Sequence, residues 1–153
     1  MTPLRQFLET TLLPTFAQAF DVESLVLNIG AGKHAYREYF RCLIRTADIV
    51  PGCDETFPAE AIPYPDASVD GILFNGVFER LDDPMQAMRE VFRVLKPGGT
   101  LLFSALNLNF EWHSPLDRWR LTRAGARHVV RAFQVIEEHW VGHEGYFYLL
   151  RKA

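Results

Sequence analysis

The feature that most constrains the fold is a short apolar run that stops at a glycine-rich turn. Residues 24–29 read Ser-Leu-Val-Leu-Asn-Ile, and Gly30-Ala31-Gly32 follows at once. Buried parallel strands read as continuous apolar runs of this kind. Glycines directly after such a strand permit a tight turn and let a ligand approach the backbone. The pattern therefore predicts a strand with a binding loop at its carboxyl end.

An acidic residue follows this loop at an informative distance. Asp48 lies 18 residues after Gly30, at the end of a second expected strand over 43–48. In doubly wound folds an acid at this place accepts hydrogen bonds from ribose hydroxyls. The glycines, with Ala35 as the third position, also satisfy the dinucleotide fingerprint, so a nicotinamide-binding module is an alternative. A chain of 153 residues leaves little room for the substrate-holding part of a dehydrogenase.

Strands and helices alternate along the middle of the chain. A third apolar run covers 69–74, and Asp83-Pro84 supplies an N-cap followed by proline at the first helical position. The helix is expected to end at Gly98-Gly99, and a strand covers 100–106. This alternation predicts an α/β fold: a doubly wound, mostly parallel sheet with helices on both faces.

The remaining segments complete one expected domain over residues 1–153. It comprises an N-terminal helix over 3–20, a cofactor-binding core over 24–106, and an acceptor-side loop with a C-terminal hairpin over 107–150. Further expected elements are a short helix over 36–43, an irregular loop over 51–65, a helix over 123–132, and antiparallel strands over 133–141 and 145–150.

Composition excludes several classes of function. Hydrophobic residues make up 48% of the chain and the net charge is -3, which argues against electrostatic binding to nucleic acid or an anionic membrane. No stretch is apolar for long enough to span a bilayer. Cys42 and Cys53 lack the spacing of a zinc site, so we expect no metal, no disulfide and a cytoplasmic location.

Three longer segments resemble one protein family. Residues 61–70, Ala-Ile-Pro-Tyr-Pro-Asp-Ala-Ser-Val-Asp, resemble the "aLPFpdxsFD" segment of class I S-adenosylmethionine-dependent methyltransferases of the type 11 group. Residues 77–84 resemble their "vLEHvpdP" segment, and residues 93–99 match their "RvLKPGG" turn. Two further segments resemble a subgroup with a shortened second helix: residues 32–37 its "GxxPYR" loop, and residues 117–122 its "DYYRfT" segment.

The resemblance implies a Rossmann-like domain that binds S-adenosylmethionine and methylates an acceptor that we expect to be a small molecule. It assigns Gly30, Ala31 and Gly32 to the methionine end of the cofactor, Asp48 and Ile49 to its ribose and adenine, and Asn75 and Gly76 to the sulfonium region. Glu60 and Ala61 complete the implied cofactor residues, together with Asn28. The acceptor and the oligomeric state stay open.

Several positions depart from the family pattern. Asn28 replaces an Asp or Glu, and Pro58 replaces an Asp that commonly receives the adenine amine. Glu60, two positions on, is a substitute acceptor, while Arg80 replaces a frequent His and Leu116 another. These departures favour an alternative, a degenerate family member that binds the cofactor weakly or not at all and serves as a partner or regulatory subunit. We expect Asp at positions 28 and 58 to tighten binding.

Methyl transfer requires a base only when the acceptor must lose a proton. His113 lies in the loop after the 100–106 strand and has a suitable ordinary pKa, although a solvated loop histidine explains it too. Glu79 and Asp117 are the other catalytic candidates. Capping and ion pairing with Arg80 or Arg120 explain these two carboxylates equally well.

Overall fold

The structure is a computed structural model that describes residues 1–107 and 116–153. Its seven strands form one sheet in the order β3-β2-β1-β4-β5-β7-β6, in which β7 runs antiparallel to both β5 and β6 and all other pairs are parallel. The strands are β1 Leu25–Ile29, β2 Leu43–Asp48, β3 Glu55–Thr56, β4 Val69–Phe74, β5 Leu95–Leu106, β6 Gln134–Val141 and β7 Gly145–Arg151. The predicted parallel sheet with a C-terminal antiparallel hairpin is confirmed.

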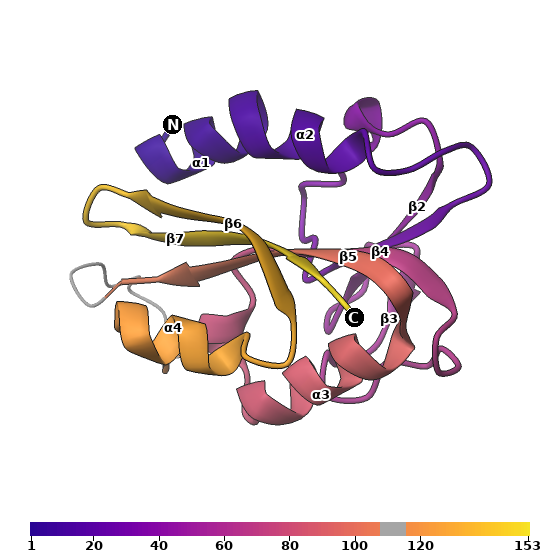
Figure 1. Ribbon diagram of the computed structural model, residues 1–153. Coiled ribbons are helices and arrows are strands. Elements are labelled where there is room, and N and C mark those ends of the chain that lie inside the picture. The colour runs from indigo at the N-terminus through magenta and orange to yellow at the C-terminus, as the bar shows by residue number, and fades with distance from the viewer. Residues whose placement is uncertain (108–115) are drawn as a thin grey trace.

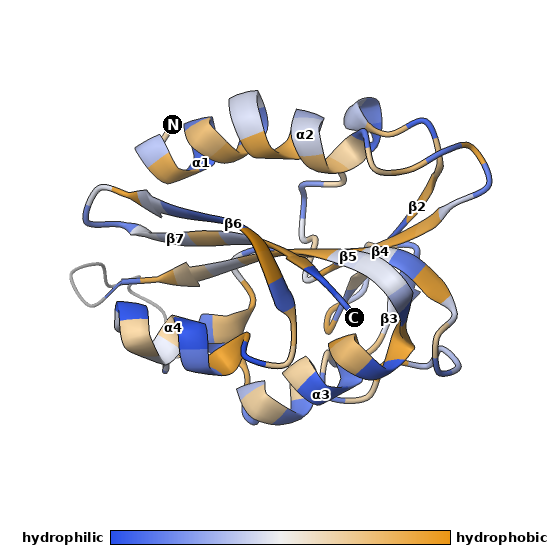
Figure 2. Ribbon diagram, in the orientation of Figure 1, coloured by the Kyte–Doolittle hydropathy of each residue, from blue (hydrophilic) through white to orange (hydrophobic). Residues whose placement is uncertain are grey.

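Helices cover both faces of this sheet (Figure 1). The N-terminal helix lies along one face, while α3 (Pro84–Val94) and α4 (Arg123–Val129) lie on the other. Two hydrophobic clusters result, one on each face. In Figure 2 the hydrophobic side of the N-terminal helix is turned toward the sheet. This helix buries Leu8, Leu12 and Phe16 in a cluster with Val26 of β1 and Leu73 of β4.

The N-terminal helix continues through a proline, Pro14. It consists of α1 (Pro3–Phe7), a π-helical turn (Leu8–Leu12) and α2 (Leu13–Ala17). A backbone N–H is missing at Pro14, so a regular α-helix would leave one carbonyl without its donor. The wider turn absorbs this defect, because the N–H of Leu13 donates to the carbonyl of Leu8, five residues earlier. The helix ends at Ala17, three residues before the predicted end.

α3 begins as predicted but ends early. The Asp83 side chain accepts from the N–H of Gln86, and Pro84 occupies the first turn. The helix ends at Val94, and Gly98-Gly99 belongs to β5 instead. The C-terminal tail decides this: the N–H of Gly98 donates to the carbonyl of Lys152 at 2.7 Å, and the N–H of Lys152 donates to Gly99 at 2.9 Å.

Other differences concern short elements. The helix expected over 36–43 is one 3₁₀ turn, Arg37–Tyr39, and the irregular loop over 51–65 contains the two-residue strand β3. β3 pairs with the carboxyl end of β2, because the N–H of Phe57 donates to the carbonyl of Asp48 at 3.0 Å. α4 ends at Val129, earlier than predicted.

Arg93 ties the loop before β4 to α3. Its guanidinium donates to the carbonyls of Ile62 and Tyr64 at 2.9 and 2.8 Å, and it pairs with Glu90 and Asp66. A planar group with five donors suits this many acceptors. The arginine of the "RvLKPGG" match is therefore a structural residue that holds the loop beside the candidate site.

Candidate functional site

The candidate site lies where β1, β2 and β4 end. Strand register places Ile29 level with both Ala47 and Phe74, so the residues that follow these strands meet at one edge. The N–H of Gly30 donates to the carbonyl of Ala47 at 2.8 Å and fixes the first turn of the loop. The structure thus brings together the glycine loop, Asp48 and the segment that starts at Asn75.

The glycines of this edge differ in their surroundings. Gly30, Gly32 and Gly76 all have left-handed backbone, with φ of 68°, 52° and 66°. A Cβ at Gly30 would lie 2.3 Å from Cγ2 of Val77, so this glycine is required by packing. A Cβ at Gly32 or Gly76 would meet nothing within 4 Å. These two glycines therefore leave open space beside their backbone, where a ligand can approach.

Asp48 links the end of β2 to the glycine loop. Its Oδ2 accepts from the N–H of Gly32 at 3.0 Å, and its Oδ1 accepts from the N–H of Ile49 at 2.7 Å. These hydrogen bonds orient a half-buried carboxylate at the sheet edge. Ile49 beside it is 71% exposed, although it is a large apolar side chain.

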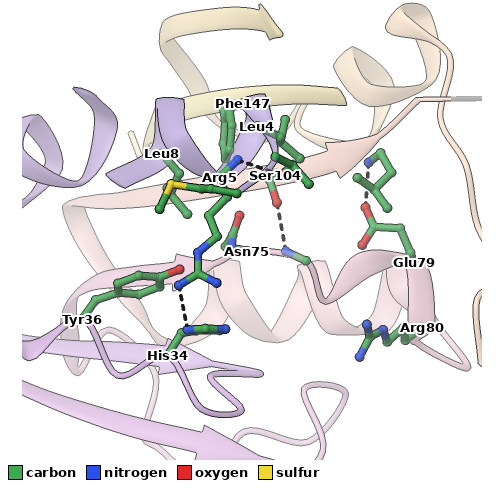
Figure 3. A pocket seen from close by; sticks show the side chains of 14 residues that line it. Leu4, Arg5, Leu8, His34, Tyr36, Asn75, Glu79, Arg80, Ser104 and Phe147 are labelled. Carbon is green, nitrogen blue, oxygen red and sulfur yellow. Dashed lines mark hydrogen bonds between the residues drawn. The ribbon is translucent and has the colours of Figure 1, made fainter. Parts of the chain in front are cut away.

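A cavity of about 520 Å³ opens next to this edge, between the sheet and the N-terminal helix (Figure 3). Segments from four parts of the chain line it. They supply Met1, Thr2, Leu4, Arg5 and Leu8 from the N-terminal helix, His34 and Tyr36 after the glycine loop, Asn75, Gly76, Glu79 and Arg80 after β4, and Ser104, Leu106 and Phe147 from the sheet. The Oγ of Ser104 accepts from the N–H of Gly76 at 2.9 Å, which holds the segment after β4 against β5.

Glu79 is the buried acid of this cavity. It lies in the 3₁₀ turn Phe78–Arg80, and only 2% of its surface is exposed. Its Oε1 accepts from the N–H of Leu106 at 2.7 Å. Burial raises the pKa of this carboxyl, although the hydrogen bonds from backbone N–H groups and the charge of Arg120 oppose the shift. A carboxyl with a raised pKa at a cavity wall is suited to accept a proton.

The other two catalytic candidates are placed differently. Asp117 forms a bidentate ion pair with Arg120, and its side chain is 3% exposed. It does not line the cavity. His113 lies outside the described residues, so its role stays a prediction.

Asn28 holds the loop that follows the glycines. Its Nδ2 donates to the carbonyl of His34 at 2.8 Å and to the carbonyl of Ala35 at 3.3 Å. An aspartate cannot donate these hydrogen bonds and would direct a negative charge at two carbonyl oxygens. The amide thus has a structural role here, and the expectation that Asp at position 28 tightens cofactor binding stays a prediction.

We predict that Asn28→Asp lowers the free energy of unfolding by roughly 2 kcal/mol at neutral pH, because the carbonyls of His34 and Ala35 lose their donor and face a carboxylate instead. Burial and the two oxygens should raise the pKa of the new carboxyl. An acid with a raised folded pKa costs stability above its unfolded pKa of about 4 and regains it at lower pH. Urea titrations at pH 4 and 7 should therefore show a deficit that shrinks at pH 4. A pH-independent deficit, or none, would contradict this account.

The remaining predicted residues are Glu60 and Ala61, which precede β4 in the chain. Oε1 of Glu60 accepts from the N–H groups of Asp82 and Asp83 at 3.2 and 3.4 Å, so this carboxylate caps the segment that leads into α3. Ala61 is exposed, and its N–H donates to the carbonyl of Pro58 at 3.0 Å. Glu60 thus has backbone partners of its own, and its contact with an adenine amine stays a prediction.

Sequence reasoning missed the contribution of the N-terminal helix. Leu4, Arg5 and Leu8 line the cavity, but their apolar spacing indicates only an amphipathic helix that packs somewhere on the domain. Tyr36 was part of a recognised motif, yet its left-handed backbone (φ 55°) and its burial beside the cavity follow from the fold. Packing across the sheet has no local signal in the sequence.

No helix in residues 1–107 or 116–153 has both the length and the apolar character needed to cross a bilayer. Within the same residues, no three His, Cys, Asp or Glu side chains gather as a metal ion would require.

Comparison with known proteins supplies the family. The model of the methyltransferase domain, type 11, matches residues 27–103. Malonyl-[acyl-carrier protein] O-methyltransferase 1 of Coxiella burnetii is 50% identical over 46 residues, which are 30% of this chain and 16% of that protein. The ubiquinone/menaquinone biosynthesis C-methyltransferase UbiE of Cronobacter sakazakii is 48% identical over 64 residues, which are 37% of this chain and 26% of that protein. The matches thus span about a quarter or less of these two relatives' own length.

Solved structures share the fold over nearly the whole chain. A methyltransferase from Aquifex aeolicus, described as S-adenosylmethionine-dependent, covers 100% of both chains with a TM-score of 0.70 and 17% identity. The 1,6-didemethyltoxoflavin-N1-methyltransferase of Burkholderia thailandensis, solved with S-adenosylhomocysteine, covers 94% of this chain and 77% of its own (TM-score 0.73, 18% identity). The match to the [4+2]-cyclase SpnF covers 92% of this chain and 79% of the cyclase (TM-score 0.76, 18% identity). The family model, which matches half of the sequence, decides the assignment: this chain belongs to the type 11 methyltransferase domain family.

Proposed function

We propose that this chain is an S-adenosylmethionine-dependent methyltransferase that acts on a small-molecule acceptor. One observation carries the proposal: the open left-handed Gly76 lines a cavity beside the carboxyl edge of the sheet, and at the same edge the open left-handed Gly32 donates its N–H to the carboxylate of Asp48. In open α/β sheets ligands bind in the crevice at this edge. The relatives that share the matched segments are methyltransferases of small or carrier-bound molecules by name.

The residues of this edge fit the proposed cofactor. Gly30, Ala31 and Gly32 would hold its methionine end, because the open side of Gly32 admits a ligand against the backbone. Asp48 and Ile49 would hold the ribose and adenine, one by its carboxylate oxygens and the other by its exposed apolar side chain. Asn75 and Gly76 would lie toward the reacting methyl group, since both line the cavity.

When bound, the cofactor supplies a methyl group that its sulfonium already activates. The protein therefore needs mainly to orient an acceptor and exclude water. Leu4 and Leu8 from the N-terminal helix and Phe147 from β7 give the cavity apolar walls. Glu79, with its raised pKa, is the described residue placed to take a proton from the acceptor.

A second candidate function is that of a degenerate family member that serves as a partner or regulatory subunit. The observation that favours it is that the substituted cofactor positions have structural roles. The Asn28 amide is committed to loop carbonyls, and the Glu60 carboxylate is committed to backbone N–H groups. The SpnF comparison adds that this fold alone does not decide the reaction. Measured cofactor affinity separates the two functions.

We predict that Asp48→Asn weakens the binding of S-adenosylmethionine by 1–3 kcal/mol, roughly 5- to 150-fold, because a charged acceptor of ribose hydroxyls is lost. Calorimetric titration with S-adenosylmethionine and S-adenosylhomocysteine measures this. Asp21→Asn is the matched control, because Asp21 precedes β1 and lies toward the opposite edge of the sheet. Equal affinity of both variants would remove Asp48 from the site. No binding by the unmutated chain at millimolar cofactor would overturn the enzyme proposal.

A further inference from the structure

The cavity wall carries an arginine whose charge has no partner in the described part of the chain. Arg80 ends the 3₁₀ turn Phe78–Arg80, is exposed, and lines the cavity. Its backbone carbonyl accepts from Arg118, but no carboxylate of residues 1–107 or 116–153 pairs with its guanidinium. Figure 3 shows this side chain beside the cavity, below Glu79.

Acidic residues on either side of Arg80 are all committed elsewhere. Glu79 turns inward and accepts from the N–H of Leu106. Asp82 pairs with Arg118. Asp83 caps α3, because its side chain accepts from the N–H of Gln86. The local fold leaves the charge of Arg80 available to a ligand.

The opposite side of the cavity carries a second arginine, which is paired. Nη2 of Arg5 lies 3.3 Å from Nδ1 of His34, and Nε of Arg5 lies 2.7 Å from Oε1 of Glu9. In Figure 3 Arg5 and Arg80 stand on opposite sides of the space that Asn75 faces. Apolar side chains form the rest of the wall, among them Leu4, Leu8, Leu106 and Phe147. The cavity is therefore apolar, with the guanidinium of Arg80 on one side and the Arg5–Glu9 ion pair on the other.

We propose that the acceptor is an amphipathic organic acid, whose carboxylate pairs with Arg80 and whose apolar body lies against the N-terminal helix and Phe147. This inference rests on the proposed function and names its substrate class. A planar guanidinium binds a carboxylate through two parallel hydrogen bonds, which fixes orientation as well as charge. An amine acceptor in its ammonium form would be repelled from the same place.

The test uses 2-naphthoate and its neutral isostere 2-naphthamide as probes, titrated by calorimetry into the full chain. We expect the acid to bind roughly tenfold or more tightly than the amide, and Arg80→Gln to abolish that preference while leaving amide binding unchanged. Arg89→Gln is the matched control, because Arg89 lies on α3, is 64% exposed, and does not line the cavity. It should retain the preference for the acid.

Three results would overturn the inference: equal affinity for acid and amide, an acid preference that survives Arg80→Gln, or no binding of 2-naphthoate at millimolar concentration. The same preparation titrated with S-adenosylmethionine separates this inference from the proposed function. Cofactor binding without an acid preference removes only the substrate class. An acid preference that depends on Arg80, without cofactor binding, removes the methyltransferase proposal and leaves an acid-binding site.

Discussion

Replacing Gly30 by alanine should lower the free energy of unfolding by roughly 2–5 kcal/mol, because two costs add at this position. Left-handed backbone costs an L-residue about 1–2 kcal/mol, and φ here is 68°. The new Cβ would lie 2.3 Å from Cγ2 of Val77 and 3.3 Å from its Cβ. Val77 is buried and branched at Cβ, so it cannot turn aside, and overpacking of this kind costs about 1–3 kcal/mol. Urea denaturation measures the loss.

Gly32→Ala is the matched control for this prediction. Its backbone is also left-handed, at φ 52°, but no atom lies within 4 Å of an added Cβ. The stability cost should therefore be limited to about 1–2 kcal/mol of backbone strain. The added methyl group would instead occupy the open side of the loop. The free energy of cofactor binding should therefore fall by more than the free energy of unfolding. If Gly32→Ala destabilises the chain as much as Gly30→Ala, the contact with Val77 is not the cause.

Removing the side chain of Glu79 should cost roughly 2–4 kcal/mol of stability. Glu79→Ala leaves the buried N–H of Leu106 without its acceptor and opens a void beside the cavity. Glu79→Gln keeps an oxygen that can accept from Leu106 and should retain the fold. If proton transfer by Glu79 is needed, Glu79→Gln should lose methyl transfer while its cofactor affinity stays unchanged. Chemical denaturation and calorimetric titration of both variants separate these effects.

The pH dependence of stability gives an independent check on Glu79. Because burial raises the pKa of its carboxyl above the unfolded value of about 4, its ionisation opposes folding. This residue's contribution is therefore present at low pH and is lost as pH rises through the folded pKa. Glu79→Gln should gain stability relative to the unmutated chain between pH 4 and pH 7. A constant difference across this range would mean that Glu79 has an ordinary pKa.

The main strands and α3 could be predicted because their signals are local. The run that ends at Ile29 and the cap at Asp83 each specify an element within a few residues. Element ends were less predictable, since partners distant in the sequence set them. β5 starts at Leu95 and includes Gly98-Gly99 because Lys152 forms hydrogen bonds with that segment. No residue near Gly98 in the sequence indicates this contact.

The candidate site divides in the same way. Gly30, Asp48 and Asn75 could be placed together from the sequence, because Asp48 ends one strand, Gly30 and Asn75 directly follow two others, and the strands are parallel. The sequence shows that an amide stands at position 28 in place of an acid, but only the folded chain shows that this amide donates to two loop carbonyls. Hydrogen-bond direction depends on the loop conformation, which residue identity does not specify.

The order of strands and helices, the glycine loop and the acid after it could all be predicted from neighbouring residues. Periodicity, capping and turn chemistry act over short stretches of chain. Tertiary structure decided which side chains share the cavity. Leu4 and Leu8 meet Phe147 only because the N-terminal helix packs across the strands that end the chain. Arg80 keeps an available charge only because Glu79 and Asp82 find other partners. Contacts of this range depend on how layers pack, and packing is a property of the whole chain.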